Sequence, residues 1–377
     1  MTVQLADHPG SVPGPATAAT ADSAGVFRMR RSRVPLVLTG LTVALVLLSL
    51  AALALGPVTV PLSDTVRVLV GATPSDPRWQ VLIETLRAPR ALTAIVVGAA
   101  LGTAGLQLQT LFRNALADPY VLGVSSGASL GVAMVVVTGA GSASAGFTAG
   151  VAGLGRAGVV LAAAVGAAAV LALVLLLSRW VRSAVTLLLV GVMIGSASTA
   201  IVSVLLVYAN PQRAQQFLLW GLGSFAGTSW ADLRLMGVVV AVGIIAALAN
   251  SRALNALLMG ENYARTTGIS VVRARLIILL SASLLAGATT AYCGPVAFLG
   301  LAVPHLARMA CGTSDHRALL PAVILMGAVV ALACGIASET PGSDSVLPLN
   351  AVTSLIGAPI VVAVLLRSRR GVDGMSL

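Results

Sequence analysis

The sequence predicts an all-α polytopic membrane protein with about ten transmembrane helices. Of its 377 residues, 58% are hydrophobic and only 9% are charged, whereas soluble domains carry roughly a quarter charged residues. The mean hydropathy of +0.99 points the same way. The apolar runs are continuous and do not alternate with a period of two. This favours helices over a β-barrel, because a helix satisfies its own backbone hydrogen bonds within the bilayer.

Apolar runs bounded by charged residues, prolines or glycine clusters define the expected spans. Most are about twenty residues long, which is enough to cross the hydrocarbon core, and the eighth is shorter. We expect the ten spans near residues 34–56, 91–111, 120–139, 157–178, 184–208, 232–249, 272–293, 296–311, 319–338 and 350–366. They make one transmembrane domain, 34–370, between a disordered tail at 1–33 and a short tail at 371–377.

The distribution of arginine orients these spans. The net charge is +11, and every basic residue is an arginine. With the amino terminus inside, sixteen arginines fall in inner loops and seven in outer loops, as the positive-inside rule requires. Both termini are therefore expected in the cytoplasm, and the chain in a bacterial inner membrane. Membrane orientation explains the basic charge, so the lipid bilayer is an expected partner and nucleic acid is not.

Small residues predict close packing between the helices. Glycines recur at a spacing of four, as at Gly98 and Gly102 and again at Gly191 and Gly195. This spacing places both glycines on one face of a helix, where a neighbouring backbone can approach. By itself the pattern indicates only a compact bundle.

The chain lacks residues that several other functions need. A P-loop uses a lysine to reach the nucleotide phosphates, and this sequence has none, so any hydrolysis of ATP, with its Mg, must take place on a partner. The three cysteines are too scattered for a structural metal site, and we expect no metal or other cofactor in this chain. Protease, lipase and kinase signatures are also absent, so the chain is not expected to be an enzyme.

Two segments carry a resemblance to a known family. One is residues 86–128, LRAPRALTAIVVGAALGTAGLQLQTLFRNALADPYVLGVSSGA, and the other is residues 260–312, which include the pattern GL..PH..R. Both closely resemble the FecCD-type permeases of ABC importers for iron-siderophores and vitamin B12. The resemblance implies a type II ABC importer permease that works with a second permease, two cytoplasmic ATPase subunits and an extracytoplasmic binding protein.

The expected function is import of an iron-siderophore or related metal chelate, with haem and cobalamin left open. The alternative is a proton-coupled secondary transporter. That class usually carries ionisable residues deep in its helices, whereas the acidic residues here fall in tails, loops or helix ends. His305 and Arg308 lie on one face of the eighth span, and we expect a structural role for His305 because a lone histidine makes a poor metal site.

The resemblance implies that Arg87 and Arg90, at the outer start of the second span, dock acidic residues of the binding protein. Anchoring at the lipid headgroups is the alternative. Glu339 stands where relatives commonly carry a third docking arginine, and Gly335 and Asn350 also depart from the family pattern. A charge reversal at a docking surface changes what can bind there, so we expect this chain to pair with a non-identical permease.

Two inner segments complete the expected site. Asn114, Ala115 and Leu116 in the turn after the second span resemble an inner gate, faced by Ala184, Val185 and Leu188 at the start of the fifth span, although an ordinary loop is equally compatible. Residues 253–268 resemble two short coupling helices that contact the ATPase, and an interfacial amphipathic helix is the alternative. The expected coupling residues are Leu254, Leu257, Gly260, Glu261, Ala264 and Gly268.

Overall fold

The computed structural model describes residues 19–138, 156–178, 180, 184–339 and 346–373. Its long helices are α1 (Ala19–Ala54), α4 (Ala88–Leu111), α5 (Val124–Thr138), α7 (Arg156–Ser178), α8 (Ala184–Val207), α10 (Trp230–Ala249), α13 (Val271–Cys293), α14 (Leu299–Cys311), α15 (His316–Ser338) and α16 (Leu349–Asp373). Its short elements are α2 (Leu62–Leu69), α3 (Pro77–Val81), the π-helix η1 (Leu82–Arg87), the 3-10 helix η2 (Pro119–Leu122), α9 (Pro211–Gly221), α11 (Ser251–Leu258) and α12 (Glu261–Thr266).

The helix content confirms the all-α membrane fold. Within the described residues, seven helices are long and apolar enough to cross a membrane, and three shorter apolar helices cover Val124–Val137, Leu299–Cys311 and Leu349–Ala363. Together, the seven long helices and the three shorter ones correspond one to one with the ten expected spans. The sequence pattern therefore identifies every spanning element that the structure contains in its described part.

The boundaries of the first three spans differ from the expected ones for identifiable reasons. α1 begins at Ala19, ahead of the expected start at 34, because the segment from 19 to 33 contains no proline and is rich in alanine and arginine, which are good helix formers. α3, η1 and α4 form one continuous apolar stretch, Pro77–Leu111, since Arg87 and Arg90 do not interrupt a helix. The third span begins at Val124 and not at 120, because Gly123 adopts a left-handed conformation (φ +78°) after the turn of η2.

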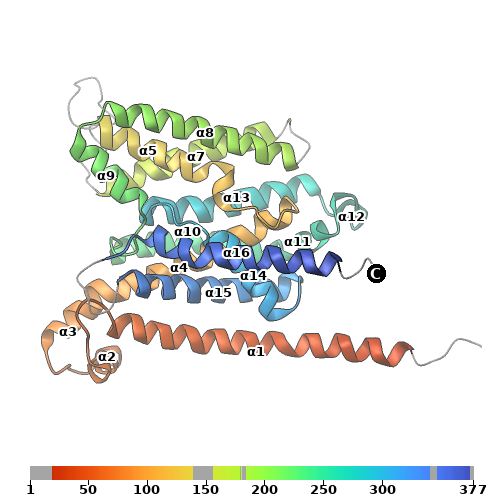
Figure 1. The fold of residues 1–377 in the computed structure, drawn as a ribbon, viewed down its shortest axis with the longest axis horizontal. Helices are drawn as coiled ribbons and strands as arrows, with labels where there is room; N and C mark the ends of the chain where they lie inside the picture. The colour runs from red at the N-terminus through yellow and green to blue at the C-terminus, as the bar shows by residue number, and fades with distance from the viewer. Residues whose placement is uncertain (1–18, 139–155, 179, 181–183, 340–345, 374–377) are drawn as a thin grey trace, which may run out of the picture.

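The helices run side by side, with α11 and α12 at the end of the bundle where the carboxy terminus lies (Figure 1). α2, α3 and α9 lie at the opposite end (Figure 1). Burial identifies the centre of the bundle: 83% of the apolar window that includes α4 is buried, against 6% for α1 and 22% for α8. α4 is thus the central helix, and the apolar faces of the outer helices are left for lipid or for another subunit.

α4 reaches its neighbours through glycine contacts. Gly98 on α4 faces Gly327 on α15, and a Cβ built on Gly327 would lie 2.7 Å from the carbonyl carbon of Gly98. Gly105 on α4 faces the backbone of Gly300 on α14 in the same way. Lipid is as apolar as the helices, so there is little hydrophobic driving force for helix association within the bilayer. The close approach of the two backbones stabilises the helix pair through van der Waals contact instead. The small-residue packing expected from the sequence is confirmed at these crossings.

We expect Gly327→Val to separate α15 from α4, because the added side chain overlaps the backbone of Gly98. Overpacking of this kind should lower the free energy of unfolding by about 1–3 kcal/mol. The measurement is the thermal unfolding midpoint of the purified protein. Gly237→Val on α10 is the matched control, since its Cβ has no atom within 4 Å. Equal midpoints for the two variants would refute the importance of the α4–α15 crossing.

Candidate functional site

We call the end of the bundle that carries α2, α3 and α9 (Figure 1) the outer end, and the opposite end the inner end, after the orientation expected from the arginine distribution. The outer end contains a buried arginine. Arg87 has an exposed fraction of only 6%. Its Nη1 donates to the carbonyl oxygen of Leu53 at 2.7 Å, and its Nη2 donates to the carbonyl oxygen of Val58. The last carbonyls of a helix have no partner within it, so Arg87 caps the carboxyl end of α1. This corrects the expectation that the Arg87 guanidinium faces the outside.

Arg90 and Glu339 form an ion pair next to this cap. Arg90 Nη1 lies 2.8 Å from Glu339 Oε1, with the two side chains 22% and 12% exposed. Gly56 covers the pair and Arg87, because a Cβ there would lie 2.9 Å from Arg87 Nη2 and 3.1 Å from Glu339 Oε2. The three predicted docking residues are therefore brought together, and they connect the outer ends of α1, α4 and α15.

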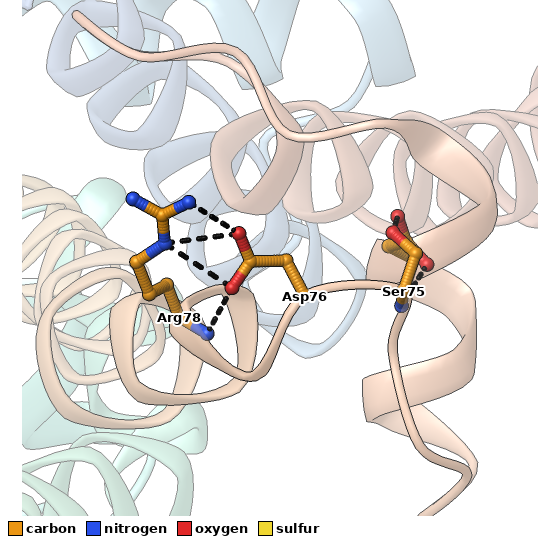
Figure 2. Close-up of polar contacts among 4 residues, drawn as sticks. Ser75, Asp76 and Arg78 are labelled. Atoms are coloured by element: carbon orange, nitrogen blue, oxygen red, sulfur yellow. Dashed lines mark hydrogen bonds and ion pairs between the residues drawn. The ribbon is translucent and has the colours of Figure 1, made fainter.

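The adjoining outer loop is held by two carboxylates. Ser75 donates its hydroxyl to Asp64 at 2.6 Å and its N–H at 2.9 Å, and these hydrogen bonds lower the pKa of Asp64. Arg78 Nη2 lies 2.7 Å from Asp76 Oδ2 at the start of α3, and Figure 2 shows this pair. The hydrogen bonds from Arg78 lower the pKa of Asp76. Both carboxylates are consequently ionised at neutral pH, and the loop between α2 and α3 has a defined shape.

A pocket of about 150 Å³ opens beside the ion pair. Arg90 lines one side of it, and residues from the end of α9 and the start of α16 line the other. Asn350 fixes the start of α16 there: its Nδ2 donates to the carbonyl oxygen of Gly221 at 3.0 Å, and its Oδ1 accepts from Ala297 N–H at 3.0 Å. The asparagine that departs from the family pattern thus joins three segments of the outer end.

The segment at 253–268 folds as two short helices at the inner end of the bundle. Gly260 (φ +110°) separates α11 from α12, and Gly268 (φ +78°) follows α12. These left-handed conformations favour glycine because a Cβ would clash with the backbone. The two glycines expected to break the helices do so.

Burial assigns the faces of α11 and α12. The side chains of Leu254, Leu257 and Ala264 are 0%, 3% and 0% exposed and pack in the hydrophobic core. This corrects the expectation that they contact the ATPase directly, since they anchor the two helices to the bundle. Met259 and Tyr263, at 69% and 50%, form the exposed apolar part of this segment. The sequence analysis missed them, although Met259 sits beside the Gly260 break.

Glu261 connects α12 to the bundle. Its Oε1 lies 2.6 Å from Arg275 Nη2 on α13, and its other oxygen lies 3.9 Å from Arg265. Glu261 therefore fixes the position of α12 as well as contributing charge to the inner end.

The turn after α4 is held by α14. His305 Nε2 lies 2.9 Å from the carbonyl oxygen of Ala115, and Asn114 Oδ1 accepts from Leu116 N–H at 2.9 Å. Arg308 Nη1 donates to Gln109 Oε1 at 2.7 Å on the last turn of α4. The structural role expected for His305 is confirmed by this contact. Gln109 was missed, and its position as a polar residue inside an apolar span is the signal that could have found it.

The second half of the predicted gate lies at the start of α8. Val185 is 60% exposed and Leu188 is half-buried, whereas the Ala184 side chain lies outside the described residues. The hydrogen bonds described for the turn at 113–117 come from α14, α4 and the turn itself. Further along α8, Gly191 packs on η2. An open groove of about 440 Å³ follows this contact, lined by Tyr120, Val121, Ser126, Gly191, Val192, Gly195, Ser196 and Thr199.

Comparison with known proteins gives consistent matches. The model of the FecCD transport family matches residues 41–367. The hemin transport system permease protein HmuU of Yersinia pestis is 35% identical over 90% of this chain and 98% of its own length. The vitamin B12 import system permease protein BtuC of Salmonella paratyphi A is 33% identical over 78% of this chain and 86% of its own length.

A solved structure agrees with the fold. It is an ABC transporter, assigned to the metal-chelate type, in an inward-facing conformation. It superposes on 88% of this chain and 99% of its own chain with a TM-score of 0.75 and 30% sequence identity. The likeness extends over the whole bundle.

We expect Arg90→Gln to destabilise the outer end, because it leaves the largely buried Glu339 carboxylate without its cation. The free energy of unfolding should fall by about 1–3 kcal/mol, measured from thermal unfolding midpoints. The double exchange Arg90→Glu with Glu339→Arg should recover part of the loss. Arg78→Gln is the control, since its pair is exposed and such pairs contribute below about 1 kcal/mol. If Arg90→Gln lowered the unfolding midpoint no more than Arg78→Gln does, the structural importance of the Arg90–Glu339 pair would be contradicted.

Proposed function

The chain belongs to the FecCD transport family and is a permease subunit of an ABC importer in the inner membrane, and from this premise we propose that it translocates an iron-siderophore or related metal chelate. The chelate would arrive from an extracytoplasmic binding protein and leave into the cytoplasm. The observation that carries the proposal is the pair of short helices α11 and α12 at the inner end, anchored by buried side chains and exposing Met259 and Tyr263.

This arrangement suits a chain that is driven by a partner. A P-loop lysine cannot come from a sequence without lysine, so the free energy of ATP hydrolysis must enter through a contact surface. Exposed aromatic and methionine side chains are enriched at such contacts. We place two ATPase subunits, carrying ATP and Mg, against the exposed face of α11 and α12, one on each permease.

The groove beside α8 supports a chelate as the transported molecule. None of its eight lining residues carries a formal charge. Ser126, Ser196 and Thr199 are its hydroxyl-bearing residues besides Tyr120, whose hydroxyl accepts from Val296 N–H at 3.0 Å. Such a wall can hydrogen-bond a bulky chelate weakly without retaining it. The named substrates of the relatives, hemin and vitamin B12, are both large metal complexes, and we extend this class to ferric siderophores here.

The gate is proposed at the inner end of the groove. Leu116, at 43% exposed, and Val185, at 60%, leave apolar surface uncovered on this chain. Apolar side chains can close a path by excluding water. With Asn114 and Ala115 shaping the turn and Ala184 and Leu188 on α8, we propose that this closure is completed by a second permease.

The outer end supports docking of the binding protein. Arg90 presents its charge at the outer pocket and is paired with Glu339, while the buried Arg87 lies next to this pair. Since Arg90 is partly neutralised by Glu339, this subunit offers less positive charge than an arginine at position 339 would give. We propose that it pairs with a non-identical permease, each meeting a different lobe of the binding protein, with both termini in the cytoplasm.

Uptake should depend on ATP and not on a proton gradient. The complete complex in proteoliposomes, given binding protein loaded with a ferric hydroxamate siderophore, should accumulate radioactive iron only when hydrolysable ATP is on the ATPase side. A protonophore should have no effect. Uptake driven by a proton gradient without the ATPase would select the secondary-transporter alternative. Transport of haem or cobalamin in place of the siderophore would reject the siderophore assignment alone.

Tyr263→Ala should weaken binding of the ATPase. Removing an exposed aromatic side chain from the centre of a contact reduces affinity about tenfold or more. The measurement is the amount of ATPase that co-purifies with the permease. Tyr208→Ala is the matched control, because Tyr208 is 85% exposed at the opposite end of the bundle, after α8. Equal ATPase recovery with both variants would exclude Tyr263 from the contact.

A further inference from the structure

A chain of hydrogen bonds connects α11 to α15 at the inner end. Asn255 on α11 donates its Nδ2–H to Asp315 Oδ1 at 2.6 Å. Its Oδ1 accepts from His316 N–H at 2.8 Å and lies 2.8 Å from His316 Nδ1. Asp315 is the amino-terminal cap of α15 and accepts from Arg317 N–H at 3.0 Å. One side chain of α11 therefore binds both the cap and the first residue of α15.

This series of hydrogen bonds continues from α15 to α4. His316 Nε2 lies 2.8 Å from Thr110 Oγ1, and these two residues are only 1% and 2% exposed. Because an ionised carboxylate can only accept, the Asn255 amide nitrogen must face Asp315 and its oxygen must face His316. The proton of a neutral ring is then on Nδ1, which leaves Nε2 as an acceptor. The Thr110 hydroxyl lies 2.8 Å from both Nε2 and the carbonyl oxygen of Leu106, so its one proton is shared between these two acceptors.

Thr110 lies one residue before the end of α4, next to the predicted gate. Its carbonyl oxygen accepts from Arg113 N–H at 3.3 Å, and the carbonyl oxygen of Gln109 accepts from Asn114 N–H at 3.1 Å. α14 contacts the same turn through His305 and the same helix end through Arg308. A displacement of the last turn of α4 therefore changes the position of residues 113–117.

Because this connection is made of hydrogen bonds, it fixes the position of α11 relative to α15 and α4. Apolar contacts between α11 and the bundle are non-directional and allow neighbouring helices to slide, whereas buried hydrogen bonds fix one register. Separating His316 from Thr110 or Asn255 would leave a nitrogen of the buried His316 ring without its partner, which is unfavourable. α11 cannot then move without carrying the start of α15 and the end of α4.

We infer that Asn255, His316 and Thr110 are positioning residues that transmit a displacement of α11 to the gate turn at 113–117. The inference rests on the proposed function, in which the ATPase pushes or pulls on α11 and α12. The three residues touch no substrate and no nucleotide in this role. They act by making α11, α15 and α4 move as one unit at the inner end.

The test uses Thr110→Val, which keeps the shape of the side chain and removes its hydroxyl. In the complete complex in proteoliposomes, the ATPase should co-purify as in the wild type and hydrolyse ATP, while chelate transported per ATP falls about three- to tenfold. Thr110→Ser, which restores the hydroxyl, should restore the ratio. Thr103→Val is the matched control: this threonine is buried on α4 about two turns earlier, and its hydroxyl has no hydrogen-bond partner among the described residues.

A double-variant cycle sharpens the test. Asn255→Ala should lower the same ratio, and combining it with Thr110→Val should lower it no further, because both remove one connection. An unchanged ratio in Thr110→Val, additive losses in the double variant, or loss of the ATPase from the Thr110→Val complex would each overturn the inference. Failure of the proposed function looks different, because the wild-type complex itself would then show no ATP-driven uptake.

Discussion

The close approach of α4 to its neighbours is the constraint on which the rest of the structure depends. Helices in a bilayer gain little from hiding apolar surface from lipid, so they associate through tight packing. α4 meets this requirement with Gly98, Gly102 and Gly105 on faces that contact α15 and α14. Because Gly98 and Gly105 bring backbone against backbone, the position of α4 is closely defined, and this also fixes the positions of the polar groups at both of its ends.

One rigid helix therefore joins the two functional ends. At the outer end, Arg87 caps α1 and Arg90 pairs with Glu339 just where α4 begins. About one turn before the end of α4, Gln107 Nε2 donates to Ser281 Oγ at 3.1 Å, which connects α4 to α13 inside the bundle. At the inner end, Thr110 receives the connection from α11 through His316. The two sets of contacts thus lie at opposite ends of the same buried element.

The sequence predicts residue types and segments at these ends better than it predicts their contacts. It identifies 253–268 as a pair of short helices, but helical spacing does not say which face a neighbour covers, and Leu254, Leu257 and Ala264 turn out to be buried. The charge on Arg87 suggests a side chain that faces the solvent. In the structure its guanidinium is buried, because it donates hydrogen bonds to carbonyl oxygens at and just after the end of α1. The α11–α15–α4 connection joins residues 255, 316 and 110, and a local sequence pattern cannot predict a contact between residues so far apart in the sequence.

The sequence by itself determined the fold class, the ten spans, their expected orientation and the fact that this chain cannot supply a P-loop lysine. These follow from hydropathy, arginine placement and the absence of lysine, which are properties of single residues or short runs summed along the chain. Only the tertiary structure decided which polar groups are paired: Arg90 with Glu339, Glu261 with Arg275, and Asn255 with His316. The reason is physical, since a buried charge or hydrogen-bonding group is stable only with a partner nearby, and that partner is supplied by the packing of helices distant in sequence.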